Sequence, residues 1–109
     1  MFYNCNSLSS LDISNFNTEI VTSMEEMFRY CTLLSSLDLS NFNTQNVITM
    51  ERMFYNCRSL YYLDISNFIF KKETDIFNSL PNNCYIKMNN KSNIKINTVP
   101  STCQILMID

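Results

Sequence analysis

The stretch Met27-Phe28-Arg29-Tyr30-Cys31, with Leu37-Asp38-Leu39-Ser40-Asn41-Phe42 close behind it, occurs in three related copies along this chain. The same pattern begins at Met1 and again at Met53, so successive copies are evenly spaced. A fixed period of this length is typical of proteins in which each small unit buries its apolar face by stacking on its neighbours. Such proteins act mainly through extended binding surfaces, so the repeat favours binding over catalysis.

The first half of each repeat has the pattern of a strand. Leu8-x-x-Leu11-x-Ile13 matches the start of a leucine-rich repeat, and apolar residues alternate with polar ones as in a half-buried strand. We predict one parallel sheet with strands centred on 11–13, 37–39 and 63–65, paired at an offset of one repeat. The expected core consists of Leu11, Leu37, Leu63, Phe16, Phe42, Phe68, Met24 and Met50.

The second half of each repeat has apolar residues at the helical spacing i, i+3, i+4, i+7. In the first two copies these residues are Met24, Met27, Phe28 and Cys31, then Met50, Met53, Phe54 and Cys57. Good N-cap residues precede the three segments, namely Ser23, Thr49 and Asp75. We therefore expect a short helix of about two turns in each repeat, the third ending at Pro81.

Together these patterns predict an α/β repeat solenoid. It would be a right-handed leucine-rich-repeat-like coil, with parallel strands on one face and short helices on the other. Three repeats would occupy 1–26, 27–52 and 53–80, and the non-repeating segment 81–109 would form a small β C-terminal cap. Because Met1 occupies the same repeat position as Met27, we expect the chain to be a fragment of a longer array.

The composition argues against most kinds of active site. The chain has no His, which excludes an imidazole base and His-ligated metal, and no Gly, which excludes phosphate-cradling loops. A net charge of −2 gives no electrostatic case for nucleic acid, and no apolar run is long enough to cross a membrane. We expect no enzyme activity, no cofactor, no metal, no nucleic-acid partner and no membrane insertion.

The five cysteines have more than one interpretation. Cys5, Cys31 and Cys57 recur at the repeat offset on the inward side, where they are expected to be small buried apolar residues. Disulfides between stacked copies would have poor geometry, because their Cβ vectors run parallel. Cys84 and Cys103 are the first pair to test for a disulfide, although all five thiols also fit a reducing compartment.

A polar column on the sheet follows from the repeat. Asp12, Asp38 and Asp64 would stack on the solvent side of the sheet with Tyr62 beside them, and exposed Tyr is a common interface anchor. The carboxylates could bind a cation or a basic ligand, or form a solvated row that prevents edge aggregation. We predict that a protein ligand docks at Asp12, Asp38, Asp64 and Tyr62.

Asparagine forms another column, and it also has to replace glycine in turns. Asn15, Asn41 and Asn67 are expected to hydrogen-bond amide to amide along the stack. In the absence of Gly, we expect Asn and Asp to occupy the left-handed backbone positions.

The repeat resembles the BspA-like leucine-rich repeat surface proteins, whose unit has the form M-F-x-x-C-x-S-L-x-x-L-D-L-S-N-F-x-T-x-x-V-x-x-M. The match covers 1–24, 27–50 and 53–68, and it departs at Ile69-Phe70-Lys71-Lys72. The resemblance implies a cell-surface or secreted array that binds host or extracellular-matrix proteins, as in adhesion, without catalysis. The alternative is a structural spacer that caps a longer array and has no ligand, and an intracellular location stays open.

Overall fold

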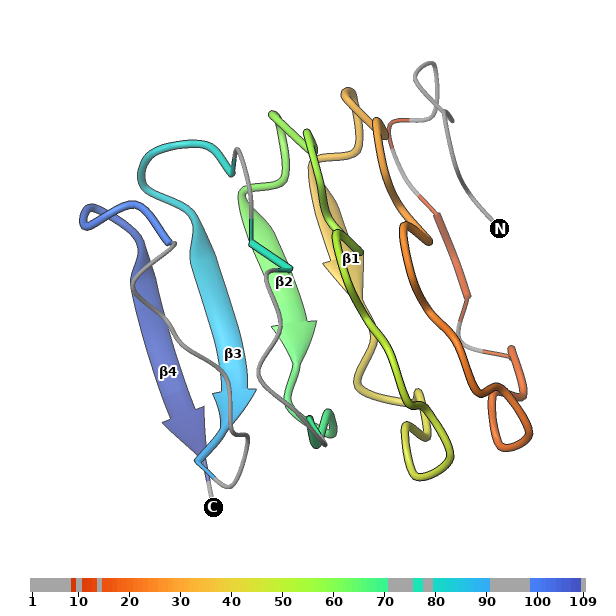
Figure 1. Cartoon of the computed structure of the whole chain (residues 1–109). Coiled ribbons are helices and arrows are strands. Elements are labelled where there is room, and N and C mark those ends of the chain that lie inside the picture. Colours follow the sequence, from red (N-terminus) through yellow and green to blue (C-terminus); the bar gives the residue numbers. More distant parts are fainter. Residues whose placement is uncertain are drawn as a thin grey trace.

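The computed structural model describes residues 9, 11–13, 15–70, 76–77, 80–90 and 99–108. Its four strands lie side by side in one parallel sheet, in the order in which they occur in the chain (Figure 1). They are β1 (Ser36–Asp38), β2 (Tyr62–Ile65), β3 (Tyr85–Asn89) and β4 (Gln104–Ile108).

The register of the sheet follows the sequence repeat at first. Ser36 pairs with Tyr62, which confirms the predicted offset of one repeat for β1 and β2. The predicted strand at 11–13 is not formed, although Ser35 N–H still donates to Ser9 C=O across 3.4 Å at the same offset. The repeat therefore sets the stacking of the first turn, but regular strand pairing begins with β1.

The last two strands lie in the segment predicted as the β C-terminal cap, and they continue the same parallel sheet. Tyr62 pairs with Tyr85 and Tyr85 pairs with Gln104, at offsets that become shorter from one strand to the next. The physical reason is burial, since Ile86 and Met88 are fully buried and extend the inward rows of the repeat strands. The alternating apolar residues of β3 are those of a strand, and β2 provides the neighbouring strand with which β3 pairs.

The predicted short helices are wrong as well, because no described residue is helical. On the side opposite the strands, amides of one repeat donate to carbonyls of the next at 2.9 Å. The pairs are Met24 with Thr49, Glu26 with Glu51, Phe28 with Met53 and Tyr30 with Tyr55. An α-helix would direct these same amides to carbonyls four residues earlier. The α/β solenoid is therefore replaced by a coil whose two sides are both held by bonds between repeats.

Tight turns take the place of the helices. Met27 N–H donates to Met24 C=O and Cys31 N–H donates to Phe28 C=O, which closes two consecutive four-residue turns. Their third residues have φ of 55° and 62°, as a type II turn requires. These turns direct the apolar residues inward, so the helical spacing predicted the buried side chains correctly and the backbone wrongly. Only positions 76, 77 and 80 of the third predicted helix are described, and none is helical.

Corner side chains complete the contacts between repeats. Thr18 Oγ1 accepts from Asn43 N–H at 2.8 Å and donates to Asn43 C=O at 3.1 Å. Thr44, one repeat later, accepts from Ile69 N–H at 3.2 Å. At the next equivalent position the chain has Phe70, which is buried in the core, so this threonine contact ends there.

The asparagine column differs from the prediction. Asn41 Nδ2 donates to Ile13 C=O at 3.3 Å, and Asn67 Nδ2 donates to Ser40 C=O. Each amide thus binds a backbone carbonyl of the preceding repeat. The Ile13 carbonyl also accepts from Phe16 N–H at 3.1 Å, so the Asn41 amide adds a second hydrogen bond to it from the next repeat. Asn15 lies at the edge of the stack, where no such bond from its side chain is described.

Positive φ angles occur at five described residues, and two of them have the expected side chain. Asn56 and Asn83 are asparagines, whereas Glu26, Tyr30 and Arg52 are not. The left-handed region costs a residue with a Cβ roughly 1–2 kcal/mol, and it costs Asn less because the Asn side chain bonds locally. The stacked ladder therefore holds three residues in an unfavourable backbone conformation.

We expect Arg52→Asn to raise the free energy of unfolding by up to about 1 kcal/mol, because it relieves part of that cost. Arg52 is exposed, with φ of 55°. Urea denaturation measures the change. Arg58→Asn is the matched control, since it removes an equal charge at an exposed position that lacks a positive φ. An equal gain in both variants would attribute the effect to charge.

The core lies between the sheet and the stacked turns. Phe28 stacks on Phe54 at 5.8 Å, and Phe54 stacks on Phe77 at 6.5 Å, with rings within 9° of parallel. Most of the predicted core residues are buried, namely Leu37, Leu63, Phe42, Phe68, Met24 and Met50. Leu11 is only partly buried and Phe16 is 40 % exposed, because both belong to the first described turn at the edge of the stack.

Leu37→Ala should lower the free energy of unfolding by about 2–5 kcal/mol, the range for removing a large buried side chain. Leu37 is 1 % exposed and lies in β1, where it is the register partner of Leu63 in β2. Leu33→Ala provides the matched control, because Leu33 is 52 % exposed. Thermal and urea unfolding of both variants measure the difference. Similar losses at the two positions would contradict the core described above.

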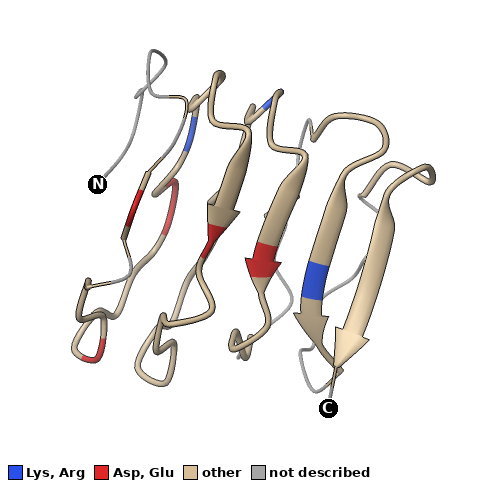
Figure 2. Ribbon diagram, turned by 180° about the vertical axis from the view of Figure 1, so that it is seen from behind, with Lys and Arg blue, Asp and Glu red and all other residues tan. Residues whose placement is uncertain are grey.

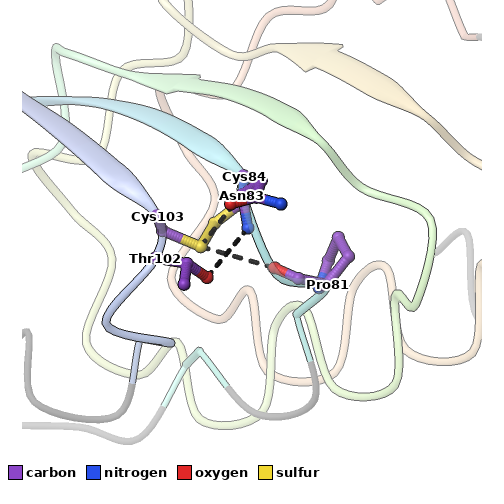
Figure 3. The surroundings of a disulfide bond; sticks show 5 residues. All are labelled: Pro81, Asn83, Cys84, Thr102 and Cys103. Carbon is purple, nitrogen blue, oxygen red and sulfur yellow. Dashed lines mark hydrogen bonds between the residues drawn. A yellow bond between two sulfur atoms is a disulfide. The ribbon is translucent and has the colours of Figure 1, made fainter.

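A disulfide joins Cys84 and Cys103, the pair that the sequence indicated for testing, with Cα atoms 4.5 Å apart (Figure 3). It links the residue before β3 to the residue before β4. Cys84 N–H donates to the Cys103 sulfur at 3.2 Å, and the Pro81 carbonyl oxygen lies 3.4 Å from the same sulfur. In the disulfide that sulfur carries no proton, so the Pro81 contact becomes a hydrogen bond only in the dithiol.

Candidate functional site

The strand face that points away from the core is termed here the outer face, and it presents two rows of side chains. The first row consists of Ser36, Tyr62, Tyr85 and Gln104, and the second consists of Asp38, Asp64, Lys87 and Leu106. Strand alternation places both rows on one surface, because every second residue points the same way.

The predicted carboxylate column is brought together in part. Asp38 is the register partner of Asp64, and Asp64 is the register partner of Lys87, so the column ends at a basic residue. Figure 2 shows acidic positions on β1 and β2 and a basic one on β3. Asp12 and Asp38 are exposed, whereas Asp64 is only 6 % exposed. The face therefore carries charges of both signs.

Two of the aspartates also bind their own strand ends. Asp38 Oδ1 accepts from Ser40 N–H at 2.9 Å, and Asp64 Oδ1 accepts from Ser66 N–H at 3.0 Å. These are Asx-turn bonds that guide the chain out of each strand. The bonds from Ser40 hold the pKa of Asp38 below its ordinary value, and the nearby Lys87 adds to this while burial opposes it.

The aromatic part of the face is a stacked pair. The rings of Tyr62 and Tyr85 lie 5.7 Å apart and within 15° of parallel. Burial raises the pKa of Tyr62, and Asp64, Asp38 and Tyr85 add to the increase. The Tyr62 hydroxyl is therefore protonated at neutral pH and can donate a hydrogen bond to a ligand.

Sequence reasoning missed Tyr85 and Lys87 as members of this face. The signal was present, because Tyr85-Ile86-Lys87-Met88 alternates in the same sense as the repeat strands. Because this segment lacks the repeat sequence, it is predicted as part of the β C-terminal cap and not as a strand of the outer face, and in the structure its offset from β2 is shorter than one repeat.

The free cysteines in the described part of the chain have no features of a reactive site. Cys31 and Cys57 are buried, and Cys57 Sγ donates to Phe28 C=O at 3.0 Å. Burial raises the pKa of Cys57 to about 12, so the thiol stays protonated and is a poor nucleophile. The interpretation as buried apolar residues is confirmed for these two, while Cys5 lies outside the described residues. Across the described ranges, no group of three or more His, Cys, Asp or Glu could hold a metal ion.

Asp38→Asn tests the Asx-turn role of the aspartates through its pH dependence. Asn keeps an oxygen for Ser40 N–H but cannot ionise. A carboxyl with a lowered folded pKa stabilises the fold above its unfolded pKa and loses that contribution as the pH falls through the folded pKa. We expect the wild type to be more stable at neutral pH and the two proteins to converge below pH 3.8, the ordinary value for Asp.

Thermal melts across this pH range measure the convergence. Glu25→Gln removes an equal charge at an exposed position on the rear side and serves as the control. A constant difference between the wild type and Asp38→Asn at all pH values would show that the carboxylate charge does not contribute.

Comparison with known proteins places the chain in a family. Within the described ranges there is no helix that could span a bilayer. No curated protein and no solved structure matches the chain. The sequence model of one family matches residues 1–95, which is most of the chain. The protein therefore belongs to the family described as Mycoplasma protein of unknown function, DUF285.

Proposed function

We propose that this chain is a non-enzymatic module that binds a protein ligand through the outer face of its sheet. The observation that carries the proposal is the stacked pair of Tyr62 and Tyr85, with Asp38 and Lys87 in the adjacent row. Tyrosines that are held rigid lose little entropy on binding and often dominate the energy of an interface. Tyr62 and Tyr85 restrain each other and are both only partly exposed, so they offer a preformed apolar anchor with polar ends.

The charges around this anchor favour a partner with complementary charges of both signs. Asp38 is exposed, Asp64 is nearly buried, and Lys87 stands beside Asp64. A purely basic ligand would gain from Asp38 and be repelled by Lys87. Exposed charges of this kind act mainly on the rate of association and on specificity, and salt screens them.

The likeness of the repeat to BspA-like surface proteins supports a role in adhesion to host or extracellular-matrix proteins. It also supports a location at the cell surface or in the secreted fraction. The bond between Cys84 and Cys103 is compatible with this location, since disulfides persist in oxidising compartments.

A structural spacer is the competing function, and one observation favours it. Asp38 and Asp64 each use one oxygen to accept from a backbone amide of their own strand end. Because these bonds guide the chain out of β1 and β2, they explain the two aspartates without any ligand. Binding experiments separate the two functions, because a spacer has no ligand on this face.

We expect Tyr62→Ala to weaken binding about tenfold or more, as a central aromatic anchor does. Surface plasmon resonance against a panel of extracellular-matrix proteins first identifies a ligand for the wild type. Adding Asp38→Ala should slow association further and reduce its dependence on salt. Tyr55→Ala is the matched control, because this partly buried tyrosine packs on Tyr30 on the rear side, away from the outer face.

Circular dichroism and melting curves must show that each variant is folded. Unchanged affinity of Tyr62→Ala for a confirmed ligand would reject the outer face as the site. Equal loss in Tyr62→Ala and Tyr55→Ala would attribute the effect to stability. The absence of binding across the whole panel would favour the spacer.

A further inference from the structure

A second surface feature lies away from the tyrosine pair, where the chain leaves the carboxyl ends of β1, β2 and β3. Here the structure has a cavity of about 550 Å³, within the range typical of ligand sites. Its lining combines amide side chains with an apolar wall. The amides include Asn43, Gln45, Asn67 and Asn89, and the wall is formed by Phe42 and Ile69.

The repeat explains why amides gather at this place. Asn41 and Asn67 are equivalent positions in successive repeats, and each turns its Nδ2 toward a carbonyl of the preceding repeat. Asn43 lies in the corner between them and fixes it, because its Oδ1 accepts from Gln45 N–H at 2.9 Å. The same contacts that stack the repeats therefore bring polar, uncharged groups together at one cavity.

Several hydrogen-bonding groups of the lining remain for a ligand. Asn67 Nδ2 donates to Ser40 C=O, which leaves the Asn67 Oδ1 as an acceptor. Asn43 Oδ1 accepts from Gln45 N–H, which leaves the Asn43 Nδ2 as a donor. Among the described residues, the Gln45 side chain has no partner, so it offers both a donor and an acceptor. All three side chains are exposed.

The apolar wall has its own part in this chemistry. Ile69 is 42 % exposed, and its N–H donates to Thr44 Oγ1 at 3.2 Å, which positions its backbone at the cavity. Phe42 also lines the cavity, although its side chain is almost fully buried. A ligand in this cavity would therefore meet both hydrogen-bonding amides and apolar side chains.

None of the described lining residues is ionisable, and most of them carry amide groups. Amide groups suit a ligand whose groups both donate and accept, such as hydroxyls. A ligand that carries many hydroxyls and also an apolar C–H face fits both parts of the lining. We propose that this cavity is a binding site for a neutral sugar, distinct from the tyrosine pair of the outer face.

The test is a titration of ¹⁵N-labelled protein with four neutral sugars at millimolar concentrations: glucose, galactose, mannose and N-acetylglucosamine. We expect at least one of them to shift the side-chain amide signals of Asn43, Gln45 and Asn67 with a saturating curve. The signals of Tyr62 and Tyr85 should not move. N-acetylneuraminic acid, which carries a carboxylate, should bind no better than the neutral sugars.

Gln45→Ala should weaken the affinity for that sugar about five- to tenfold, as expected for the loss of one neutral hydrogen bond. Gln104→Ala is the matched control, because Gln104 is an exposed glutamine on β4 outside the cavity. Its affinity should equal that of the wild type. Unchanged circular dichroism shows that both variants are folded.

Two outcomes would overturn the proposal. One is the absence of shifts at the cavity amides with all four neutral sugars. The other is an equal effect of Gln45→Ala and Gln104→Ala. Free sugars and protein-linked glycans share this chemistry, so the sugar that binds is then compared with a glycoprotein that carries it, before and after deglycosylation.

Discussion

The backbone hydrogen bond from one repeat to the next is the interaction on which the remaining structure depends. It occurs on the strand side, where Leu39 N–H donates to Asp64 C=O at 2.8 Å, and on the rear side, where Phe28 N–H donates to Met53 C=O at 2.9 Å. Buried amides and carbonyls must be paired, so a chain that pairs them between repeats has no need of helices. The core, the corners and the outer face all take their positions from this pairing.

Most buried positions and the register of β1 with β2 could be predicted from the sequence, because burial follows residue type, but the fold class could not. The spacing of Met24, Met27, Phe28 and Cys31 correctly indicated an inward face. It could not distinguish a helix from two consecutive tight turns, because both bring these positions to one side. The deciding information lies in the partner of each amide, which is a carbonyl of the next repeat. The periodicity of apolar residues within a single repeat cannot reveal a hydrogen bond between two repeats.

The candidate site, too, could be predicted only in part from the sequence. Strand alternation placed Asp38 and Tyr62 on one face, and the structure keeps them there. The sequence could not show that Asp64 is nearly buried, or that Lys87 and Tyr85 extend the rows, because those facts depend on a strand whose offset departs from the repeat. The cavity at the strand ends was not predicted, since its residues meet only when two corners stack.

The threonine and asparagine contacts at the corners restrict how such a gene can change during evolution. Thr18 bonds to Asn43, and Asn41 bonds to Ile13. Each of these contacts joins residues of two successive repeats, so it depends on the number of residues between them. Gaining or losing one residue inside a strand would turn its side chains to the wrong face and displace the corner contacts. Duplication or deletion of a whole repeat unit keeps every donor opposite an acceptor. Length variation among related genes should therefore occur in steps of one repeat.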